Sequence, residues 1–215
     1  MRGHTFERKN KQLFMWKGLK NKLTKKLQKV FWIYLTHNFV IKGMNDFKMF
    51  EPEIKCEFIP MTADNYYRVR DFREENRISE YRDKLAHNEV GFFADYNGEM
   101  IGSIWATINK AEVPNVVRTY VKLMPNEGLI HDIVTGEKSR GMGVGPFMVS
   151  RIALVLVKEY GLSRIIIDVN IKNHASLRMM EKVGLRIDHK MFYVSAFGKL
   201  VLQLMLKKYH LPCLS

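Results

Sequence analysis

Three glycines at alternate positions, Gly141, Gly143 and Gly145, stand directly before Pro146 and a long apolar stretch. Glycine permits positive φ angles and lets a ligand approach the backbone closely. Successive exposed N–H groups at the start of a helix form a site for an anion, and the helix dipole favours the same charge. The neighbouring Arg140 adds a fixed positive charge. The segment therefore predicts a phosphate-binding loop, although glycine clusters also occur in plain turns.

Two common phosphate-binding motifs do not fit this loop. A P-loop would continue into GKS or GKT, and GMGVGP lacks the G-x-G-x-x-G spacing of a dinucleotide site. The two cysteines, Cys56 and Cys213, have neither CxxC spacing nor the spacing of metal ligands, so no metal site is predicted. Two reduced thiols fit a reducing compartment, and the predicted location is the cytoplasm.

The elements around the loop must hold it at the end of a strand and the start of a helix. A strand is predicted at 128–135, and a helix from Pro146 to about Tyr160, because proline suits a first helical position. A continuous apolar strand follows at 163–170, and then a short helix at 174–183.

The remaining elements complete a mixed α/β sheet. The residues at 91–109 predict a hairpin, since Asn97-Gly98 supplies the two left-handed residues of a type I′ turn. The other predicted elements are a strand at 53–61, a helix from Thr62 to about Asn76, a helix at 78–87, and strands at 186–195 and 199–207 hinged at residues 196–198.

Two stretches of this domain resemble the signatures of one enzyme superfamily. RGMGVG, residues 140–145, resembles the R/Q-x-x-G-x-G/A motif of the GNAT N-acyltransferases and follows its strand at their usual spacing. NHASLRMMEKVGL, residues 173–185, is similar to their second signature, N-x-x-A/S…E-K-x-G-F. The resemblance covers about residues 53–207. It implies a mostly antiparallel GNAT-like sheet with splayed central strands flanked by helices, and acetyl-CoA as the acyl donor.

The resemblance also implies which residues hold acetyl-CoA. Backbone groups in the cleft between the splayed strands would pair with the amides of the pantetheine arm, and these belong to Ile133, Val134 and Thr135. The loop and its arginine would hold the diphosphate, through Arg140, Gly141, Met142, Gly143, Val144 and Gly145. Asn173 matches the position that contacts the pantetheine arm, and Ser176 lies one helical turn further on.

Direct acyl transfer to an amine requires a group that accepts the amine proton. His131, on the strand leading into the pantetheine segment, is the candidate base, since histidine ordinarily titrates near a pKa of about 6.5. It should share a face with Leu129 and Ile133. Asp132 and Glu127 are rival candidates that could act through water.

The departing thiolate benefits from a proton donor. Many GNAT enzymes place a tyrosine in the second signature for this role, but here the matching residue is Met180, which cannot donate a proton. Tyr193, on the strand after the short helix, is the predicted substitute. The alternative is a thiolate that leaves unaided, stabilised by nearby dipoles.

The net charge of +13 is concentrated near the N-terminus, where residues 1–50 hold 12 Lys or Arg and two acids. Within residues 15–34 the apolar residues recur every three or four positions, and lysines occupy much of the rest. We predict a basic N-terminal extension, residues 1–50, whose amphipathic helix lies on an anionic membrane surface. Docking on the domain or a partner, and RNA binding, remain alternatives. The enzymatic domain is predicted at residues 51–210.

The predicted activity is transfer of an acetyl group from acetyl-CoA to a primary amine. The segment 68–83 is rich in both charges, which suits a polar acceptor such as an amino sugar or another small amine near the membrane. One alternative acceptor is macromolecular, a protein amine or an aminoacyl-tRNA. Another alternative is a non-catalytic module that only binds CoA, which Met180 would favour.

Overall fold

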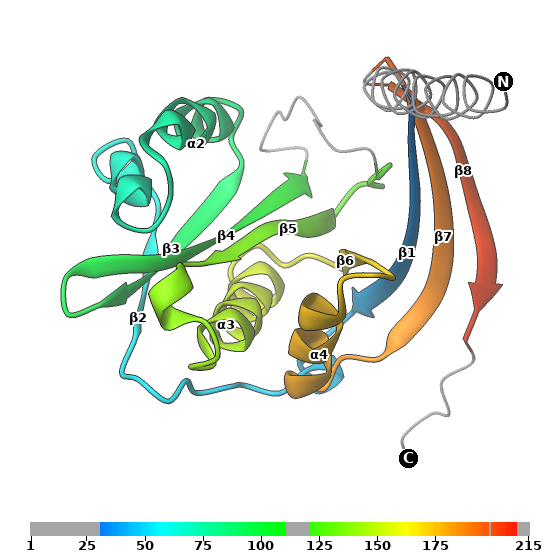
Figure 1. The fold of residues 1–215 in the computed structure, drawn as a ribbon. Helices are drawn as coiled ribbons and strands as arrows, with labels where there is room; N and C mark the ends of the chain where they lie inside the picture. The colour runs from blue at the N-terminus through cyan, green and yellow to red at the C-terminus, as the bar shows by residue number, and fades with distance from the viewer. Residues whose placement is uncertain (1–30, 111–120, 198, 210–215) are drawn as a thin grey trace, which may run out of the picture.

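The computed structural model of the chain describes residues 31–110, 121–197 and 199–209. Its strands form one sheet in the order β2-β3-β4-β5-β6-β1-β7-β8 (Figure 1). The strands are β1 (Phe31–Ile41), β2 (Glu57–Pro60), β3 (Val90–Tyr96), β4 (Glu99–Asn109), β5 (Glu127–Thr135), β6 (Arg164–Asn170), β7 (Ile187–Ala196) and β8 (Lys199–Lys208). Only β5 and β6 pair in parallel; every other neighbouring pair is antiparallel. The predicted mixed, mostly antiparallel sheet is confirmed.

Helices cover both faces of the sheet (Figure 1). The helices are α2 (Ile78–Ala86), α3 (Val144–Lys158) and α4 (His174–Lys182), with the short 3-10 helices η1 (Met44–Asp46), η2 (Tyr66–Asp71), η3 (Glu75–Arg77) and η4 (Glu137–Ser139). The main core lies under α3, whose Met148, Ile152 and Leu156 are fully buried. A second cluster lies under α2 and contains Tyr81 and Trp105.

The β3–β4 hairpin forms as the sequence predicts. Asn97 and Gly98 have φ angles of 53° and 81°, the two left-handed residues that a type I′ turn requires. The carboxylate of Asp95 accepts a hydrogen bond from the Gly98 amide at 2.8 Å, which fixes the turn.

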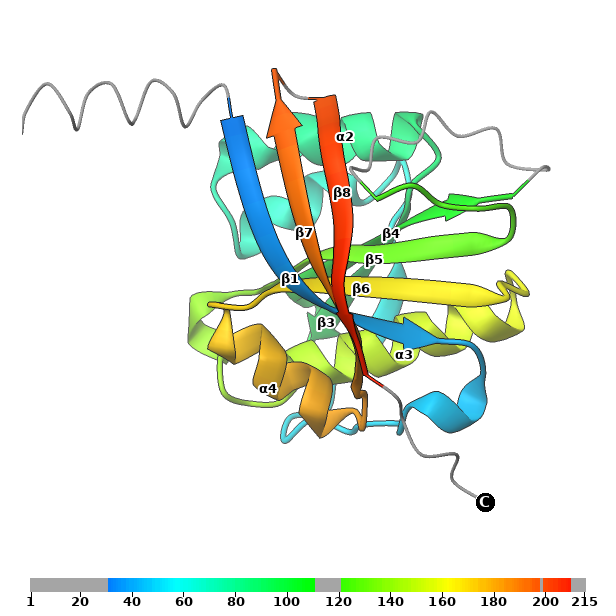
Figure 2. The ribbon, with the colours of Figure 1, turned by 90° about the vertical axis from the view of Figure 1, so that its right-hand side faces the viewer.

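The strand β1 departs from the prediction. It lies between β6 and β7, in register with both, so that Phe39 pairs with Ile167 and Tyr34 with Tyr193 (Figure 2). Residues 31–41 therefore belong to the sheet, and assigning them to an extension, with 31–34 in a helix, was wrong. Their aromatic and β-branched residues favour a strand, but both partner strands come from the far end of the chain. The rest of the predicted amphipathic helix lies outside the described residues.

The segment after β2 also differs from the prediction. The strand predicted at 53–61 is the shorter β2, and the helix expected at 62–76 is replaced by η2 and η3. Asn65 accepts a hydrogen bond from the Thr62 amide and donates one to the Pro60 carbonyl. Such side-chain bonds compete with helical backbone bonds, and the chain therefore turns where a regular helix was expected.

Candidate active site

A cleft opens where the parallel strands β5 and β6 diverge. They pair from Glu127 opposite Arg164 to Ile130 opposite Ile167, and no pairing between them follows in the described chain. Beyond this point β5 stays with β4, while β6 stays with β1. The predicted splay is thus confirmed. The predicted pantetheine segment, residues 133–135, lies on the diverging half of β5, and its residues are partly exposed.

A β-bulge in β5 sets the direction of the side chains in this cleft. The register with β4 shifts at Asp132 and Ile133, and Asp132 has a φ of 45°. His131 bonds Thr107, which pairs with Leu129, so His131 and Leu129 share a face. Ile133 instead packs into the core beneath α3. The predicted common face is therefore right for Leu129 and wrong for Ile133, because the bulge reverses the alternation.

The glycine loop has the backbone geometry of an anion site. Gly141 and Gly143 have φ angles of 89° and 82°, which favour glycine, and Gly143 is the N-cap of α3. The helix begins at Val144 rather than at the predicted Pro146. Pro146 is still tolerated there, because none of the first four N–H groups of a helix has an intrahelical partner. A Cβ at residue 143 would lie 2.8 Å from the Phe50 ring, so this glycine also allows close packing.

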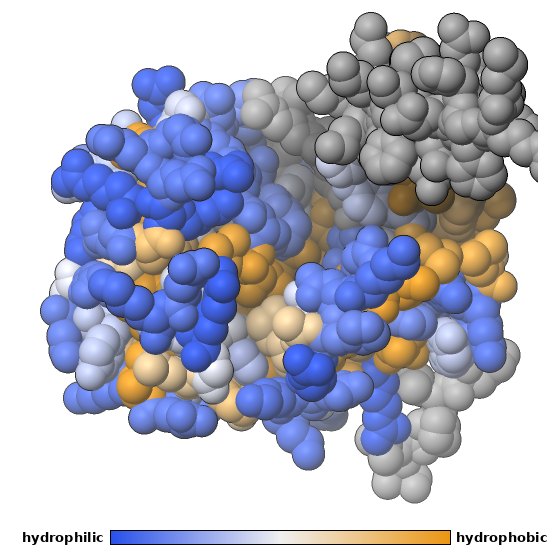
Figure 3. All heavy atoms as spheres, viewed as in Figure 1, coloured by the Kyte–Doolittle hydropathy of each residue, from blue (hydrophilic) through white to orange (hydrophobic). Residues whose placement is uncertain are grey.

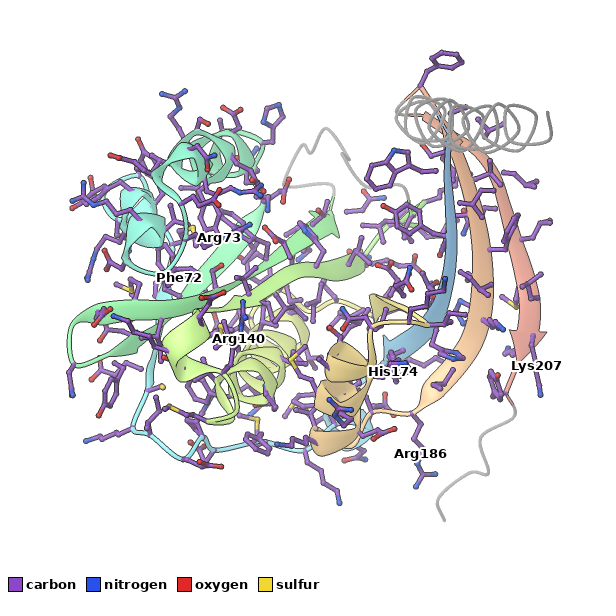
Figure 4. The ribbon with its side chains drawn as sticks, viewed as in Figure 1. Phe72, Arg73, Arg140, His174, Arg186 and Lys207 are labelled. Atoms are coloured by element: carbon purple, nitrogen blue, oxygen red, sulfur yellow. The ribbon has the colours of Figure 1, made fainter. Side chains whose placement is uncertain are left out.

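A cavity of about 350 Å³ opens beside the loop and reaches the first turns of α4. Its cationic residues are Arg140, from the loop, and Arg178 and Lys182, from α4. Figure 4 shows Arg140 before α3 and His174 at the start of α4. Three cations and a helix N-terminus suit a diphosphate. Neither Arg178 nor Lys182 was predicted from the sequence, although their i, i+4 spacing inside the second signature places them on one helical face.

The other predicted contacts on α4 have distinct positions. Asn173 is the N-cap of α4, and its Oδ1 accepts the Ser176 amide at 3.1 Å, so part of its side chain serves the helix. Ser176 lines the cationic cavity together with Thr135. Met180 is completely buried in the core with α3. The residue at the usual tyrosine position is therefore a packing residue in this chain.

His131 contacts a buried carboxylate that the sequence did not single out. Its Nε2 lies 3.0 Å from Thr107 Oγ1 and 3.2 Å from Glu89 Oε2, and the Glu89 side chain is only 6% exposed. Glu89 directly precedes β3 and carried no motif. Glu89 Oε2 has no hydrogen-bond partner among the described residues, so its contact with His131 is electrostatic, whereas Thr107 is hydrogen-bonded to Nε2.

The rival base Asp132 is held in a network of cations. It accepts a hydrogen bond from Lys84 and lies 3.7 Å from Arg73 Nη1. Burial acts to raise the pKa of Asp132, but the charges of Lys84 and Arg73 outweigh burial and lower the pKa. A carboxylate held ionised by two cations is a weak proton acceptor. The geometry therefore favours His131 over Asp132 as the base.

Two further candidates lie away from the opening. Glu127 stands where β5 and β6 are still paired, with Arg164 Nη1 at 2.9 Å from its Oε1. Tyr193 is 1% exposed, and its hydroxyl accepts a hydrogen bond from Asn38 at 3.3 Å. Burial raises the pKa of the Tyr193 phenol. Both positions suit a structural role better than the predicted chemical one.

A second, larger cavity of about 770 Å³ adjoins the cleft on the side of η2. Segments 70–74 and 99–101 line it together with residues 134–140. Phe72 packs closely on Gly136: a Cβ added to residue 136 would lie 2.9 Å from the Cβ of Phe72. Figure 3 shows apolar residues in the hollow between polar rims, and Figure 4 places Phe72 and Arg73 on the η2 side. Cavities of this size accommodate small molecules.

A comparison with known protein families agrees with the splayed strands and the glycine loop. A sequence model of the Acetyltransferase (GNAT) family matches residues 55–185. The chain belongs to the GNAT acetyltransferase family. The match spans both signatures and more than half of the chain. No curated protein matches the sequence.

Solved structures show the same GNAT fold at low sequence identity. A glucosamine N-acetyltransferase region of a fungal multi-domain β-N-acetylglucosaminidase aligns with a TM-score of 0.56 and 17% identity, over 83% of this chain and 23% of that one. A GNAT-family protein from Novosphingobium aromaticivorans gives 0.52 and 11%, over 76% and 64%. A GCN5-related N-acetyltransferase from Kribbella flavida gives 0.50 and 10%, over 80% and 62%. This GNAT chain thus spans less than two thirds of each neighbour's length.

Proposed function

We propose that this GNAT protein transfers an acetyl group from acetyl-CoA to the primary amine of a small polar molecule, with an amino sugar as the preferred class. The observation that carries the proposal is the glycine loop at the N-terminus of α3, which adjoins a cationic cavity at the mouth of the splayed strands. In this proposal the loop and its cavity would hold the diphosphate, and the cleft between the strands would hold the extended thioester arm.

The residues present fit acetyl-CoA as the donor. Arg140, Arg178 and Lys182 would balance the phosphate charge beside the loop amides. The half of β5 that leaves β6 offers a strand edge to the amides of the arm. Residues 133–135 would then carry the arm past His131.

The chemistry requires a neutral amine at the thioester carbonyl. His131 would take the proton that the amine loses as the new carbon–nitrogen bond forms, and Glu89 would stabilise the imidazolium that results. The carbon–sulfur bond then breaks and the thiolate departs, to be protonated from water. Met180 and Tyr193 are both buried, so in this scheme the proton that the thiolate receives comes from water and not from either side chain.

The large cavity favours a small acceptor over a macromolecular one. Its volume of about 770 Å³ suits a ligand of one or two sugar rings. Side chains of both charges line it, including the cations Arg70 and Arg77 and the anions Glu74 and Glu99. Such a lining suits an amine that also carries hydroxyl groups. The likeness to the fungal glucosamine N-acetyltransferase region points to the same class.

A thiol-release assay with acetyl-CoA across a panel of acceptors tests the proposal. The panel contains glucosamine, aliphatic polyamines, peptides with free N-termini and aminoacyl-tRNA. We expect turnover with the amino sugar and loss of at least 90%, or about 1.4 kcal/mol in the barrier, in His131→Ala. Turnover with tRNA or peptide alone would overturn the choice of acceptor. Acetyl-CoA binding without turnover on any amine would identify a binding module.

A further inference from the structure

One end of the β1–β7–β8 part of the sheet is apolar on both faces. The start of β1 and the β7–β8 turn lie together there, since Phe31 pairs with Ala196 (Figure 2). We call this end the sheet tip. Its large exposed residues are Trp32, Ile33, Phe197, Leu200, Val201 and Leu202. Phe197 is 78% exposed, Ile33 68% and Val201 64%, which is unusual for neighbouring side chains of this size.

The apolar surface continues from the sheet tip along β8. In the register of the sheet, Ile33 lies beside Val194, and Val194 lies beside Leu202. Further along β8, Met205 and Leu206 are more than half exposed. Among the described residues, no strand pairs with the outer edge of β8. A long apolar edge strand of this kind promotes association unless something covers it.

The net positive charge of the chain is concentrated in the parts of the sequence that contain β1, β7 and β8 or flank them. Residues 42–188 hold 21 Lys or Arg and 21 acids, so they are neutral in sum. Residues 1–41 hold ten Lys or Arg and a single acid, and residues 189–215 hold four lysines and no acid. The entire net charge of +13 therefore lies in the three outer strands and in the segments next to them. All ten of these cations belong to residues 1–30, which directly precede β1 in the sequence.

We propose that the sheet tip docks on an anionic lipid bilayer, with Trp32, Ile33, Phe197 and Val201 entering the headgroup boundary. Exposed aromatic and aliphatic side chains, on strands whose flanking sequence is rich in lysine, match the chemistry of such a surface. The proposal goes beyond the acetyl transfer and does not depend on it. Within the described residues, no helix is long and apolar enough to cross a membrane.

Other occupants fit these observations less well. A second copy of the chain carries the same net charge of +13, which opposes pairing. RNA is held through polar and charged contacts to phosphate and through bases stacked on aromatic rings, whereas most of the exposed side chains of the sheet tip are aliphatic. The excess of positive charge and the apolar tip are both accounted for by one anionic, partly apolar partner.

Vesicle sedimentation of the full chain tests the proposal. The vesicles contain phosphatidylcholine with phosphatidylglycerol, or phosphatidylcholine alone. We expect binding to the anionic vesicles only, weakened by salt, and reduced about tenfold or more in the double variant Phe197→Ser, Val201→Ser. The matched control, Met49→Ser with Met124→Ser, removes exposed apolar side chains elsewhere and should bind as the wild type does.

Three results would overturn the membrane proposal. The first is equal vesicle binding by the tip variant and the wild type. The second is a dimer in size-exclusion chromatography that the tip variant converts to a monomer, without vesicle binding by either. The third is tight binding to tRNA that vesicles do not displace. Acetyl-CoA affinity, measured on the same variants, should not change, which separates a failure of docking from a failure of folding.

Discussion

Glu89 Oε2 lies 3.2 Å from His131 Nε2, and the two residues come from segments on opposite sides of β4. The Glu89 carboxylate is buried, and Thr107 completes the surroundings of the imidazole at 3.0 Å. The hydrogen bond with Thr107 and the neighbouring carboxylate restrict the orientation of the imidazole. This pair gives the proposed proton acceptor a defined orientation.

The first prediction concerns this pair. His131→Ala should lower kcat/KM at least about tenfold, because the proton acceptor is lost. Glu89→Gln should keep part of the activity, since the imidazole remains but loses the carboxylate beside it. The measurement is the pH–rate profile of the three proteins. A profile in His131→Ala with the wild-type shape and height would remove this residue from the mechanism.

The second prediction concerns the stability of the β5 bulge. Burial opposes ionisation of Asp132, but Lys84 and Arg73 reverse its effect and lower the pKa of this carboxyl below that of an unfolded aspartate, about 3.9. The stabilisation is therefore complete above that value and is lost as the pH falls through the folded pKa. Asp132→Asn should lower the free energy of unfolding at neutral pH by about 2 kcal/mol, since the pair is only partly exposed.

Denaturant unfolding at a series of pH values checks this prediction. The stability difference between wild type and Asp132→Asn should shrink as the pH falls below about 4, because the unfolded carboxyl binds a proton there while the folded one stays ionised down to its lower pKa. A constant difference down to the acid transition would show that the charge of Asp132 contributes nothing, and that the asparagine perturbs the bulge by its shape alone.

The third prediction compares two glycines of the loop. Gly141→Ala and Gly143→Ala both force a side chain into a left-handed backbone, at a cost of about 1–2 kcal/mol. The alanine at 141 meets nothing within 4 Å, whereas the one at 143 would meet Phe50 at 2.8 Å. Thermal unfolding should therefore show a larger loss for Gly143→Ala. Equal losses would mean that Phe50 moves aside without cost.

The fourth prediction concerns the tyrosine that the sequence suggested as an acid. Tyr193→Phe should leave kcat within about twofold of wild type and cost about 1 kcal/mol of stability, because a buried hydrogen bond with Asn38 is lost. Steady-state kinetics and thermal unfolding measure the two effects. A fall in kcat of a hundredfold with little change in stability would restore Tyr193 to the chemistry.

The local signals in the sequence were sufficient for much of this fold. The turn at Asn97-Gly98 and the loop before α3 depend on backbone conformations that only a few residue types adopt readily. The second signature likewise placed α4 correctly. Each of these features is determined by residues that are close together in the chain.

The errors share a different physical origin. Strand β1 is defined by pairing with residues more than a hundred positions away, which no local periodicity reveals. The bulge at Asp132 redirected Ile133 away from the face of His131. Glu89 gained its position from the packing of β3 against β4, not from any motif. Tertiary contacts decided each of these placements.

In the proposed mode of binding, the glycine loop and the cations beside it hold the diphosphate of acetyl-CoA. Calorimetric titration of acetyl-CoA and of S-acetylpantetheine, which lacks the diphosphate, tests it most directly. The double variant Arg178→Ala, Lys182→Ala removes two of the cavity's cations, and Arg186→Ala is the control, since that side chain is exposed and lies outside the cavity (Figure 4).

We expect one acetyl-CoA to bind per chain, with an affinity that falls about tenfold or more in the double variant but not in Arg186→Ala. The weaker affinity for S-acetylpantetheine should be the same in all three proteins. Absence of acetyl-CoA binding by the wild type, or an equal loss of affinity for both ligands in the double variant, would contradict the claim.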